Sequence, residues 1–162
     1  MFGLFGKKKE AKNANEIVSP VNGKCIALDD VKDDAFSQHM LGDGIAFEMT
    51  DDMVGSPTAG TITMVADTYH AFGIEAEGGF EVLVHVGLET VALKGKGMEP
   101  QCKVGDKVKI GAPLLKVDLE VMKENNIDLT IPVIFTNGDN FEITISGVGA
   151  DVSRGESVVA TY

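Results

Sequence analysis

The segment TYHAFGIEAEGGFEVLVHVG, residues 68–87, decides the fold. Two apolar runs flank an acidic stretch that ends in two glycines, and this arrangement is typical of a β-hairpin. A turn centred between Glu77 and Gly78 would place His70 directly opposite His85, with Cβ atoms about 5 Å apart. A three-residue turn would shift the pairing by one residue and separate the two histidines. The glycines favour the first register, and we therefore predict a two-histidine site.

The same register predicts which side chains share a face of the hairpin. It sets Phe72 opposite Leu83 and Thr68 opposite Gly87, because paired strands advance in opposite directions. Side chains two positions apart then point to the same side. The residues expected on the face of the histidines are Thr68, His70, Leu83 and His85.

The rest of the chain is dominated by short runs of Val, Ile, Thr and Phe separated by Gly, Pro, Asn and Asp. Short helical turns are expected at residues 33–41, where Phe36 and Met40 share a face, and at residues 119–126. This pattern predicts an all-β fold, an antiparallel β-sandwich or barrel with one or two short helical turns. The expected strands are residues 25–28, 44–49, 60–66, 70–76, 80–87, 107–111, 114–119, 127–135, 141–147 and 157–162.

A faint internal repeat supports the sandwich. The sequence SPVNG at residues 19–23 recurs as SPTAG at residues 56–60, and each copy is followed by an apolar run. Such a repeat fits a sandwich whose two halves use one turn design.

We expect the 162 residues to form one domain at residues 17–162 behind a leader at residues 1–16. The mixed charge of the leader, MFGLFGKKKEAKNANE, favours a flexible tail. Its apolar start followed by three lysines also allows a weak contact of residues 1–9 with an acidic membrane surface.

Charge and cysteine content restrict the environment and the partners. The formal net charge is −11, with 14 Lys and Arg against 25 Asp and Glu, so the chain lacks an electrostatic footprint for nucleic acid. The acidity fits a partner with a basic face, or it serves only to keep a cytosolic protein soluble. Cys25 and Cys102 have neither zinc-site nor C-x-x-C spacing and are expected to be small buried residues in a reducing compartment. No signal peptide or membrane span is recognisable, which favours a cytoplasmic protein.

A histidine pair could bind a metal, act as a nucleophile or have only a structural role. A catalytic zinc usually takes three protein ligands, and no H-x-H or H-E-x-x-H motif adds a third. A neutral imidazole, with a pKa of about 6.5, is a good nucleophile at neutral pH. The two histidines could also merely satisfy each other's polar groups. His39, on a polar helical turn, is expected to be a surface residue.

The residues of the second strand carry a family resemblance. Gly79 to Val91, GFEVLVHVGLETV, resembles the phosphorylation-site signature of glucose-type enzyme IIA proteins of the bacterial phosphoenolpyruvate:sugar phosphotransferase system. The segments MLGDGIAF (residues 40–47), TYHAF (residues 68–72) and TVALKG (residues 90–95) resemble the same family. The likeness extends from about residue 16 to the C-terminus.

The resemblance implies a phosphocarrier with an antiparallel β-sandwich and a shallow active-site face. His85 would accept a phosphoryl group from a histidine-containing phosphocarrier protein and pass it to a cysteine on the IIB domain of a glucose-type sugar permease. His70 would be the neighbouring active-site histidine, and Thr68 would help to set the hydrogen bonds around the pair. Glu89 departs from the family, which usually has Asp at this position.

The resemblance also implies a docking surface around His85. Regulated transporters or enzymes could bind the phosphorylated and unphosphorylated protein differently at this surface, because a phosphoryl group adds about −1.5 to −2 charge. No cofactor is required, although His70 and His85 could hold zinc together with a partner's carboxylate. The apolar docking residues would be Phe36, Met40, Leu41, Leu83 and Val91. The acidic docking residues would be Asp33, Asp43 and Glu89.

Two alternatives come from other functional classes. His70 and His85 could serve a metal-dependent hydrolase. The segment VGDKVKIGAPLLKVDLEVMKEN (residues 104–125) resembles a biotinyl or lipoyl carrier hairpin, in which Lys123 would be the modified residue. That segment is about two residues longer than the carrier pattern between Gly105 and Lys123, and short motifs often match by chance.

Overall fold

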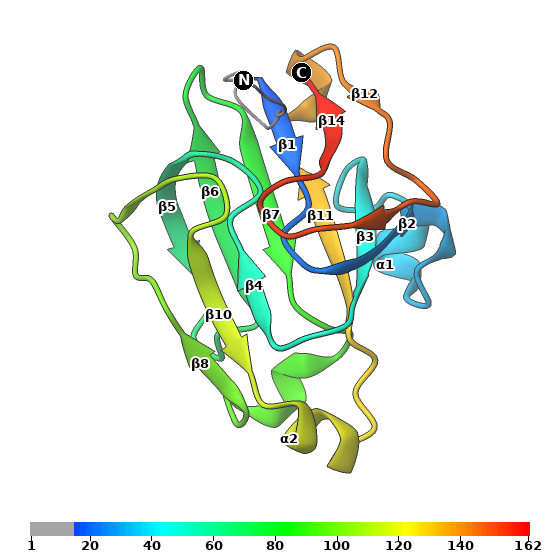
Figure 1. Cartoon of the computed structure of the whole chain (residues 1–162), viewed down its shortest axis with the longest axis vertical. Coiled ribbons are helices and arrows are strands. Elements are labelled where there is room, and N and C mark those ends of the chain that lie inside the picture. The colour runs from blue at the N-terminus through cyan, green and yellow to red at the C-terminus, as the bar shows by residue number, and fades with distance from the viewer. Residues whose placement is uncertain (1–14) are drawn as a thin grey trace, which may run out of the picture.

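The computed structural model describes residues 15–162, whose paired strands are all antiparallel. One large sheet is covered by two small sheets (Figure 1). The large sheet has the order β13 (Asp151–Val152), β2 (Gly23–Ala27), β3 (Gly44–Met49), β11 (Thr130–Phe135), β7 (Glu81–His85), β6 (Ala71–Ala76), β5 (Gly60–Val65) and β9 (Lys107–Val108). The small sheets are β1 (Glu16–Val18), β14 (Val158–Thr161) and β12 (Thr144–Ile145), and β4 (Met53–Gly55), β10 (Pro113–Val117) and β8 (Met98–Pro100). The predicted all-β antiparallel fold is confirmed.

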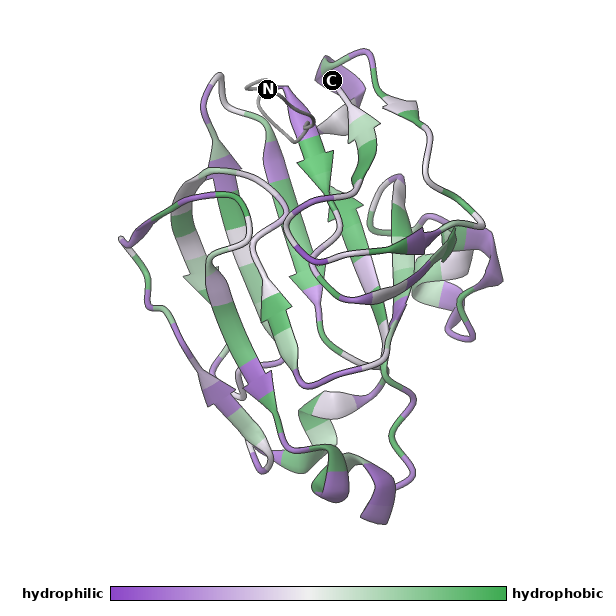
Figure 2. Cartoon of the chain, in the orientation of Figure 1, coloured by the Kyte–Doolittle hydropathy of each residue, from purple (hydrophilic) through white to green (hydrophobic). Residues whose placement is uncertain are grey.

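The core lies between the large sheet and the two small sheets. Phe72 on β6 and Val84 on β7 are fully buried there, together with Leu115 on β10. In Figure 2 the apolar residues follow the central strands, while the hydrophilic residues gather at the turns. Because side chains alternate along β7, burial of Val82 and Val84 turns Leu83 and His85 to the outer face of the large sheet.

A second, smaller core lies on that outer face. Its buried members are Leu28, Val31, Phe36, Ala46, Leu88 and Ile134, and the half-buried Leu83 packs against them. This cluster holds α1 (Asp34–Ser37) and the 3-10 turn η2 (Leu28–Asp30) against β3, β7 and β11. The second cluster therefore fixes a short helix beside His85.

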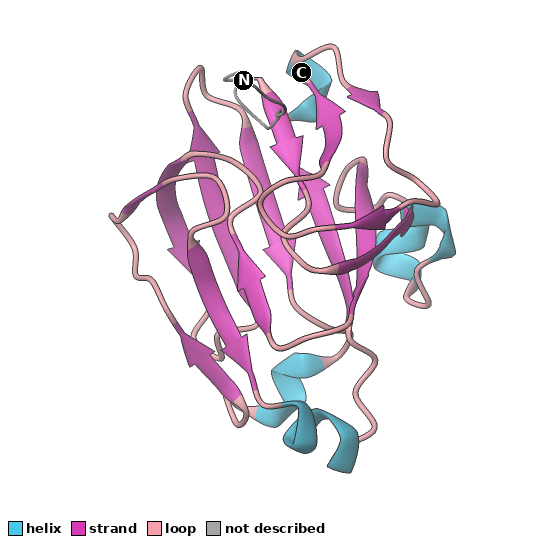
Figure 3. Ribbon diagram, in the orientation of Figure 1, coloured by secondary structure: helices cyan, strands magenta, loops and turns pink. Residues whose placement is uncertain are grey.

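The expected helical turns are both present, and several strands differ from the expectation (Figure 3). The strand expected at residues 114–119 ends at Val117, because the Asp118 side chain accepts hydrogen bonds from Glu120 N and Val121 N and caps α2 (Leu119–Glu124). The runs at residues 107–111 and 141–147 shorten to β9 and β12. The elements that were not expected are the 3-10 turns η2, η3 (Thr90–Leu93) and η4 (Gly138–Asn140) and the strands β1, β4, β8 and β13.

The N-terminal boundary shifts slightly. Glu16, assigned to the leader by sequence, is the first residue of β1. The expected membrane contact of residues 1–9 lies outside the described residues. Within residues 15–162 no helix has the length and apolar character that crossing a bilayer requires.

The SPxxG repeat forms the same local structure twice. Ser19 Oγ donates to Val21 O at 2.6 Å, and Ser56 Oγ donates to Thr58 O at 2.6 Å. Both serines are fully buried, and the glycine that ends each copy begins a strand of the large sheet. A Cβ on Gly23 would lie 1.8 Å from Glu48 O, and one on Gly60 would lie 2.2 Å from Glu75 O. Glycine is therefore required where each repeat passes the neighbouring strand.

This contact predicts that Gly60→Ala destabilises the fold by about 2 kcal/mol or more, because the methyl group would overlap backbone atoms that cannot move away. Denaturant unfolding would measure the loss. Gly73→Ala on the adjacent strand is the control. Its Cβ would have as its nearest neighbour the Thr63 side chain at 3.1 Å, and not a backbone atom within overlapping distance. Equal stability of the two variants would contradict the close-approach explanation.

Candidate functional site

The β6–β7 hairpin has a different register from the predicted one. Ala71, and not His70, pairs with His85, and Phe72 pairs with Val84 rather than Leu83. The turn contains three residues, because Ala76 N donates to Phe80 O at 2.8 Å and Gly79 N to Ala76 O at 3.0 Å. The three-residue turn shifts the pairing by one residue. The predicted pairing of Thr68 with Gly87 is also wrong, because Thr68 lies in the connection before β6 and the strand pairing ends at Ala71 and His85.

The two histidine rings nevertheless lie together. Their centroids are 5.1 Å apart with the planes at 71°. His70 lies just before β6, where Tyr69 has a left-handed backbone with φ of 60° and turns the chain out of the strand direction. His70 O then accepts from Val86 N at 2.7 Å, which fixes His70 beside the end of β7. The predicted proximity is confirmed, but a bend in the chain produces it and not direct cross-strand pairing.

The ring of His85 is oriented by a backbone carbonyl. His85 Nδ1 lies 2.9 Å from Gly87 O. A carbonyl oxygen can only accept, so Nδ1 must carry the proton. In the neutral ring the proton is therefore absent from Nε2, which keeps its lone pair. The arrangement prepares Nε2 to act as a nucleophile.

The turn after β7 holds that carbonyl in place. Thr90 is fully buried, and its Oγ1 donates to Val86 O at 2.6 Å. Gly87 has φ of 78°, and a Cβ there would lie 2.5 Å from Thr90 Cγ2. Leu88 N donates to Asp128 O at 2.9 Å. Thr90 and Gly87 are positioning residues that residue-by-residue reasoning did not single out, although both stand in the quoted signature.

Thr68 contacts the second histidine as expected. Its Oγ1 lies 2.5 Å from His70 Nδ1. Both residues belong to the connection between β5 and β6, so the threonine can fix the orientation of the His70 ring. The structure thus brings the three expected catalytic residues, Thr68, His70 and His85, into one connected group.

Burial weakens the basicity of both histidines. Desolvation is the main reason why the pKa of His85 lies below its ordinary value of 6.5; the nearby His70 lowers this pKa further, while the Gly87 carbonyl and the Asp33 charge oppose the shift. Desolvation also lowers the pKa of His70. Both rings are therefore neutral at pH 7, which is the form a nucleophilic imidazole needs.

The apolar surroundings divide into buried and exposed residues. Met40, Leu41 and Val91 are 70%, 48% and 55% exposed. Phe36, expected in an exposed patch, is 4% exposed because it belongs to the second core. Its ring still meets the edge of His85, with centroids 4.9 Å apart. Phe36 therefore packs against the His85 ring as part of the second core and offers a partner little exposed surface.

The acidic residues expected at the docking surface have structural contacts of their own. The Asp33 side chain accepts from Ala35 N at 2.9 Å and caps α1. Asp43 Oδ1 lies 2.5 Å from His39 Nδ1. His39 is exposed as predicted, but it is not isolated, because it also contacts Asp29. Glu89 precedes η3 with a left-handed backbone at φ of 59°.

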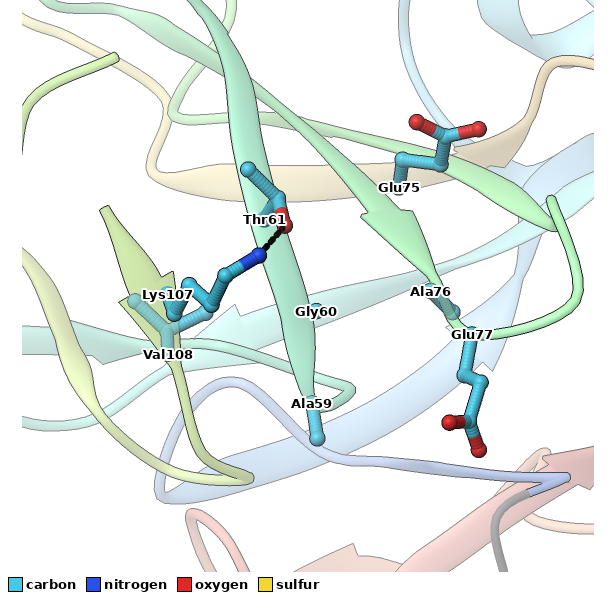
Figure 4. A pocket seen from close by; sticks show the side chains of 8 residues that line it. All are labelled: Ala59, Gly60, Thr61, Glu75, Ala76, Glu77, Lys107 and Val108. Carbon is cyan, nitrogen blue, oxygen red and sulfur yellow. Dashed lines mark hydrogen bonds between the residues drawn. The ribbon is translucent and has the colours of Figure 1, made fainter. Parts of the chain in front are cut away.

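Three hollows have linings that do not include the histidine pair. The hollow in Figure 4, about 470 Å³, lies where β5, β6 and β9 meet, at the end of β6 distant from His70. The figure shows Glu75 and Glu77 on one side and Lys107, whose amine donates to Thr61 Oγ1 at 3.3 Å, on the other. Hollows of about 410 Å³ and 290 Å³ lie beside Tyr69 and beside Glu89 respectively.

The alternative chemistries find little support in the geometry. Residues 15–162 contain no group of three His, Cys, Asp or Glu side chains that could hold a metal, whereas a catalytic zinc usually takes three protein ligands. Lys123 lies within α2 and not at a turn between strands, as a biotinyl or lipoyl carrier would require. Both cysteines are free, and burial raises the pKa of Cys25 and of Cys102 to about 11.

Comparisons with known proteins agree with one another. The family described as "phosphoenolpyruvate-dependent sugar phosphotransferase system, EIIA 1" matches residues 15–141. The glucose-specific EIIA component of Staphylococcus epidermidis is 43% identical over 157 residues, covering 96% of this chain and 94% of the relative. The corresponding component of Halalkalibacterium halodurans is 40% identical over 164 residues, covering 98% and 95%. The solved glucose permease IIA from Mycoplasma capricolum matches with a TM-score of 0.81 and 34% identity, covering 90% of this chain and 94% of that one.

The fold, the histidine pair and these relatives define a phosphotransfer component. The chain belongs to the EIIA 1 family of the phosphoenolpyruvate-dependent sugar phosphotransferase system. It is accordingly a phosphocarrier of this system, and the resemblance noted from residues 79–91 is confirmed.

The burial of the histidine pair predicts that both rings titrate below pH 6.5. Since the folded state disfavours their protonation, their contribution to stability is present above pH 6.5 and is lost as the pH falls below it. Imidazole proton shifts recorded by NMR across pH 4–9 would measure both midpoints. A His85 midpoint at or above 6.5 would contradict the desolvated site.

Proposed function

We propose that His85 carries the phosphoryl group on Nε2 between two protein partners. The Nδ1 contact with Gly87 O supports this choice of atom, because it leaves the lone pair on Nε2. The donor would be the phosphohistidine of a histidine-containing phosphocarrier protein. The acceptor would be a cysteine thiolate on the IIB domain of a sugar permease.

Each transfer is a substitution at phosphorus. The lone pair of His85 Nε2 forms the new P–N bond, the donor's P–N bond breaks, and its electron pair stays on the donor imidazole. In the second step the thiolate forms a P–S bond and the His85 P–N bond breaks. Such reactions depend on in-line positioning and charge stabilisation, which fits a site built from two oriented rings.

His70 would stabilise the phosphoryl group during both steps. The Thr68 hydroxyl donates to His70 Nδ1 in the tautomer that leaves a proton on Nε2. That N–H could donate to a phosphoryl oxygen, since the two rings are 5.1 Å apart. Thr68 would act through His70 as a positioning residue.

The partners would dock over the exposed apolar side chains beside His85. Met40, Leu41 and Val91 would exclude water from the transferring group. Acidic residues around them, Asp33, Asp43 and Glu89 among others, would attract basic residues of the partners, in keeping with the net charge of −11. Regulated transporters or enzymes could read the phosphorylation state at the same surface.

We propose a glucose-type permease as the partner, because two of these relatives are called glucose-specific EIIA components. We also propose a cytoplasmic site of action. In the N-acetylglucosamine-specific EIICBA component of Escherichia coli, which is 41% identical over 142 residues, the match covers 22% of the relative. A homologous domain thus works within a longer permease chain in that protein.

Zinc would bind only at a partner interface. His70 and His85 offer two ligands, and a carboxylate from the partner would provide the third. This arrangement predicts weak zinc binding to the isolated chain, lost in His70→Gln, and tighter binding in a complex. Calorimetry with zinc chloride would measure both, and tight stoichiometric binding by the chain alone would favour an intrinsic metal site.

The assignment of the acceptor is tested by intact-mass spectrometry after incubation with phosphoenolpyruvate, enzyme I and the phosphocarrier protein. We expect one acid-labile phosphoryl group on the wild type and none on His85→Ala. His70→Gln should still accept the group, but its onward transfer to IIB should be at least about tenfold slower, as for loss of one transition-state hydrogen bond. An unmodified wild type, with the upstream proteins shown to be active, would overturn the assignment.

Thr68→Val provides a separate test of the hydrogen bond between Thr68 and His70. The substitution keeps the shape of the side chain and removes the hydroxyl, so His70 loses its tautomer preference. We expect slower transfer to IIB and changed His70 ring-nitrogen shifts, with acceptance by His85 retained. Unchanged His70 shifts would show that the hydroxyl does not set the tautomer.

A further inference from the structure

His39 contacts two carboxylates at once. Its Nδ1 lies 2.5 Å from Asp43 Oδ1, and its Nε2 lies 2.5 Å from Asp29 Oδ1. A neutral imidazole donates from only one nitrogen, whereas both contacts require a donor if the carboxylates are ionised. The geometry therefore corresponds to an imidazolium ring between two aspartates. We call Asp29, His39 and Asp43 the histidine clamp.

The backbone at His39 is one that glycine usually provides. Met40 N donates to Ala35 O at 3.1 Å and His39 N to Phe36 O at 2.9 Å, which are the two hydrogen bonds of a Schellman motif at the end of α1. His39 occupies its left-handed position with φ of 58°. Glycine would adopt this backbone without strain, so the backbone alone does not explain a histidine here.

The clamp joins three elements beside the phosphorylation site. Asp29 belongs to η2, His39 follows α1, and Asp43 immediately precedes β3. Residues 38–43 between them display Met40 and Leu41, which are 70% and 48% exposed. Phe36, on the same short helix, touches the His85 ring. The position of this apolar segment relative to His85 is thus linked to the clamp.

We propose that His39 is a positioning residue whose protonated ring, held by Asp29 and Asp43, orders residues 38–43 for docking of the phosphocarrier protein. The inference rests on the proposed function, in which Met40 and Leu41 contact that partner. Docking then weakens when His39 loses its proton, because the ring can keep only one of its two carboxylate contacts. A preordered segment lowers the entropy lost on binding.

Most of the charges around His39 favour its protonated form. Asp29 and Asp43 contact the ring, and hydrogen bonding to Asp29 and then to Asp43 raises the pKa of His39 above 6.5. The other charged residues of this region are Asp30 on η2, Asp33 and Asp34 at the start of α1, and Lys32 between these elements. Acidic residues therefore outnumber the basic one and favour the cation.

The pH window of the clamp is separate from that of the active site. His70 and His85 have lowered pKa values and are already neutral above pH 6.5. The raised pKa of His39 means that the clamp is complete at lower pH and is lost as the pH rises through that pKa. A change in docking above pH 7 thus reports His39 without interference from the catalytic pair.

Two variants distinguish the clamp from the backbone conformation. His39→Gly removes the clamp and relieves the left-handed backbone, so a purely conformational role predicts an equal or more stable segment. His39→Arg keeps a cation whose several N–H groups can bridge two carboxylates and does not titrate below pH 12. Both variants retain Thr68, His70 and His85, so acceptance by the catalytic group should remain.

The first measurement does not require activity. Ring-nitrogen NMR across pH 5–9 should find both nitrogens of His39 protonated on the acid side of a midpoint that lies above 6.5. Amide hydrogen exchange at Met40 and Gly42 should be faster in His39→Gly than in the wild type and in His39→Arg. A His39 midpoint at or below 6.5, or unchanged exchange in His39→Gly, would overturn the clamp whether or not the chain carries phosphate.

The second measurement is the steady-state KM for the phosphorylated phosphocarrier protein between pH 6.5 and 9. For His39→Gly we expect a KM raised about threefold to tenfold at pH 6.5, as for loss of two exposed ion pairs, with kcat little changed. The wild-type KM should rise towards this value at high pH, while that of His39→Arg should stay low. Equal KM profiles for all three proteins would overturn the role in docking.

The two measurements separate the clamp from the phosphocarrier assignment. Absence of transfer by the wild type would reject the proposed function and with it the docking role. The ring titration and the amide exchange would still show whether the clamp orders residues 38–43.

Discussion

The hydrogen bond between His85 Nδ1 and Gly87 O is the constraint on which the site depends. It fixes both the orientation of the ring and the nitrogen that keeps its lone pair. The bond requires a sharp turn directly after β7, and the turn requires a glycine at φ of 78° and the Thr90 hydroxyl on Val86 O. The short sequence from His85 to Thr90 therefore combines the proposed nucleophile with the backbone that orients it.

The two faces of the large sheet have different roles, one in stability and the other in function. Its inner face carries the main core, with Phe72 and Val84 fully buried, while its outer face carries His85 and the smaller cluster under α1. That cluster buries Phe36 against His85 and leaves Met40 and Leu41 at the surface. Desolvation on this face lowers the pKa of both catalytic histidines, whereas the contacts of the exposed His39 with Asp29 and Asp43 raise the pKa of its ring.

Sequence reasoning predicted the sandwich, the SPxxG turns and the proximity of His70 to His85, because alternation and glycine placement are local signals. It failed on the hairpin register, since Gly78 and Gly79 are compatible with both turn lengths and only the Ala76–Phe80 pairing decides between them. Phe36 was expected at the surface because of the family resemblance, and a helix of four residues gives too little periodicity to show instead that its side chain is buried. The contacts of His39 with Asp29 could not be predicted, because they join residues ten positions apart through the fold.

The most direct test of the account is the identity of the phosphorylated atom. Long-range proton–nitrogen NMR of the ¹⁵N-labelled phosphorylated chain, with coupling to ³¹P, distinguishes Nδ1 from Nε2 and His85 from His70. We predict phosphorus on Nε2 of His85, with the proton retained on Nδ1 beside Gly87 O. Phosphorus on Nδ1 of His85, or on either nitrogen of His70, would contradict it.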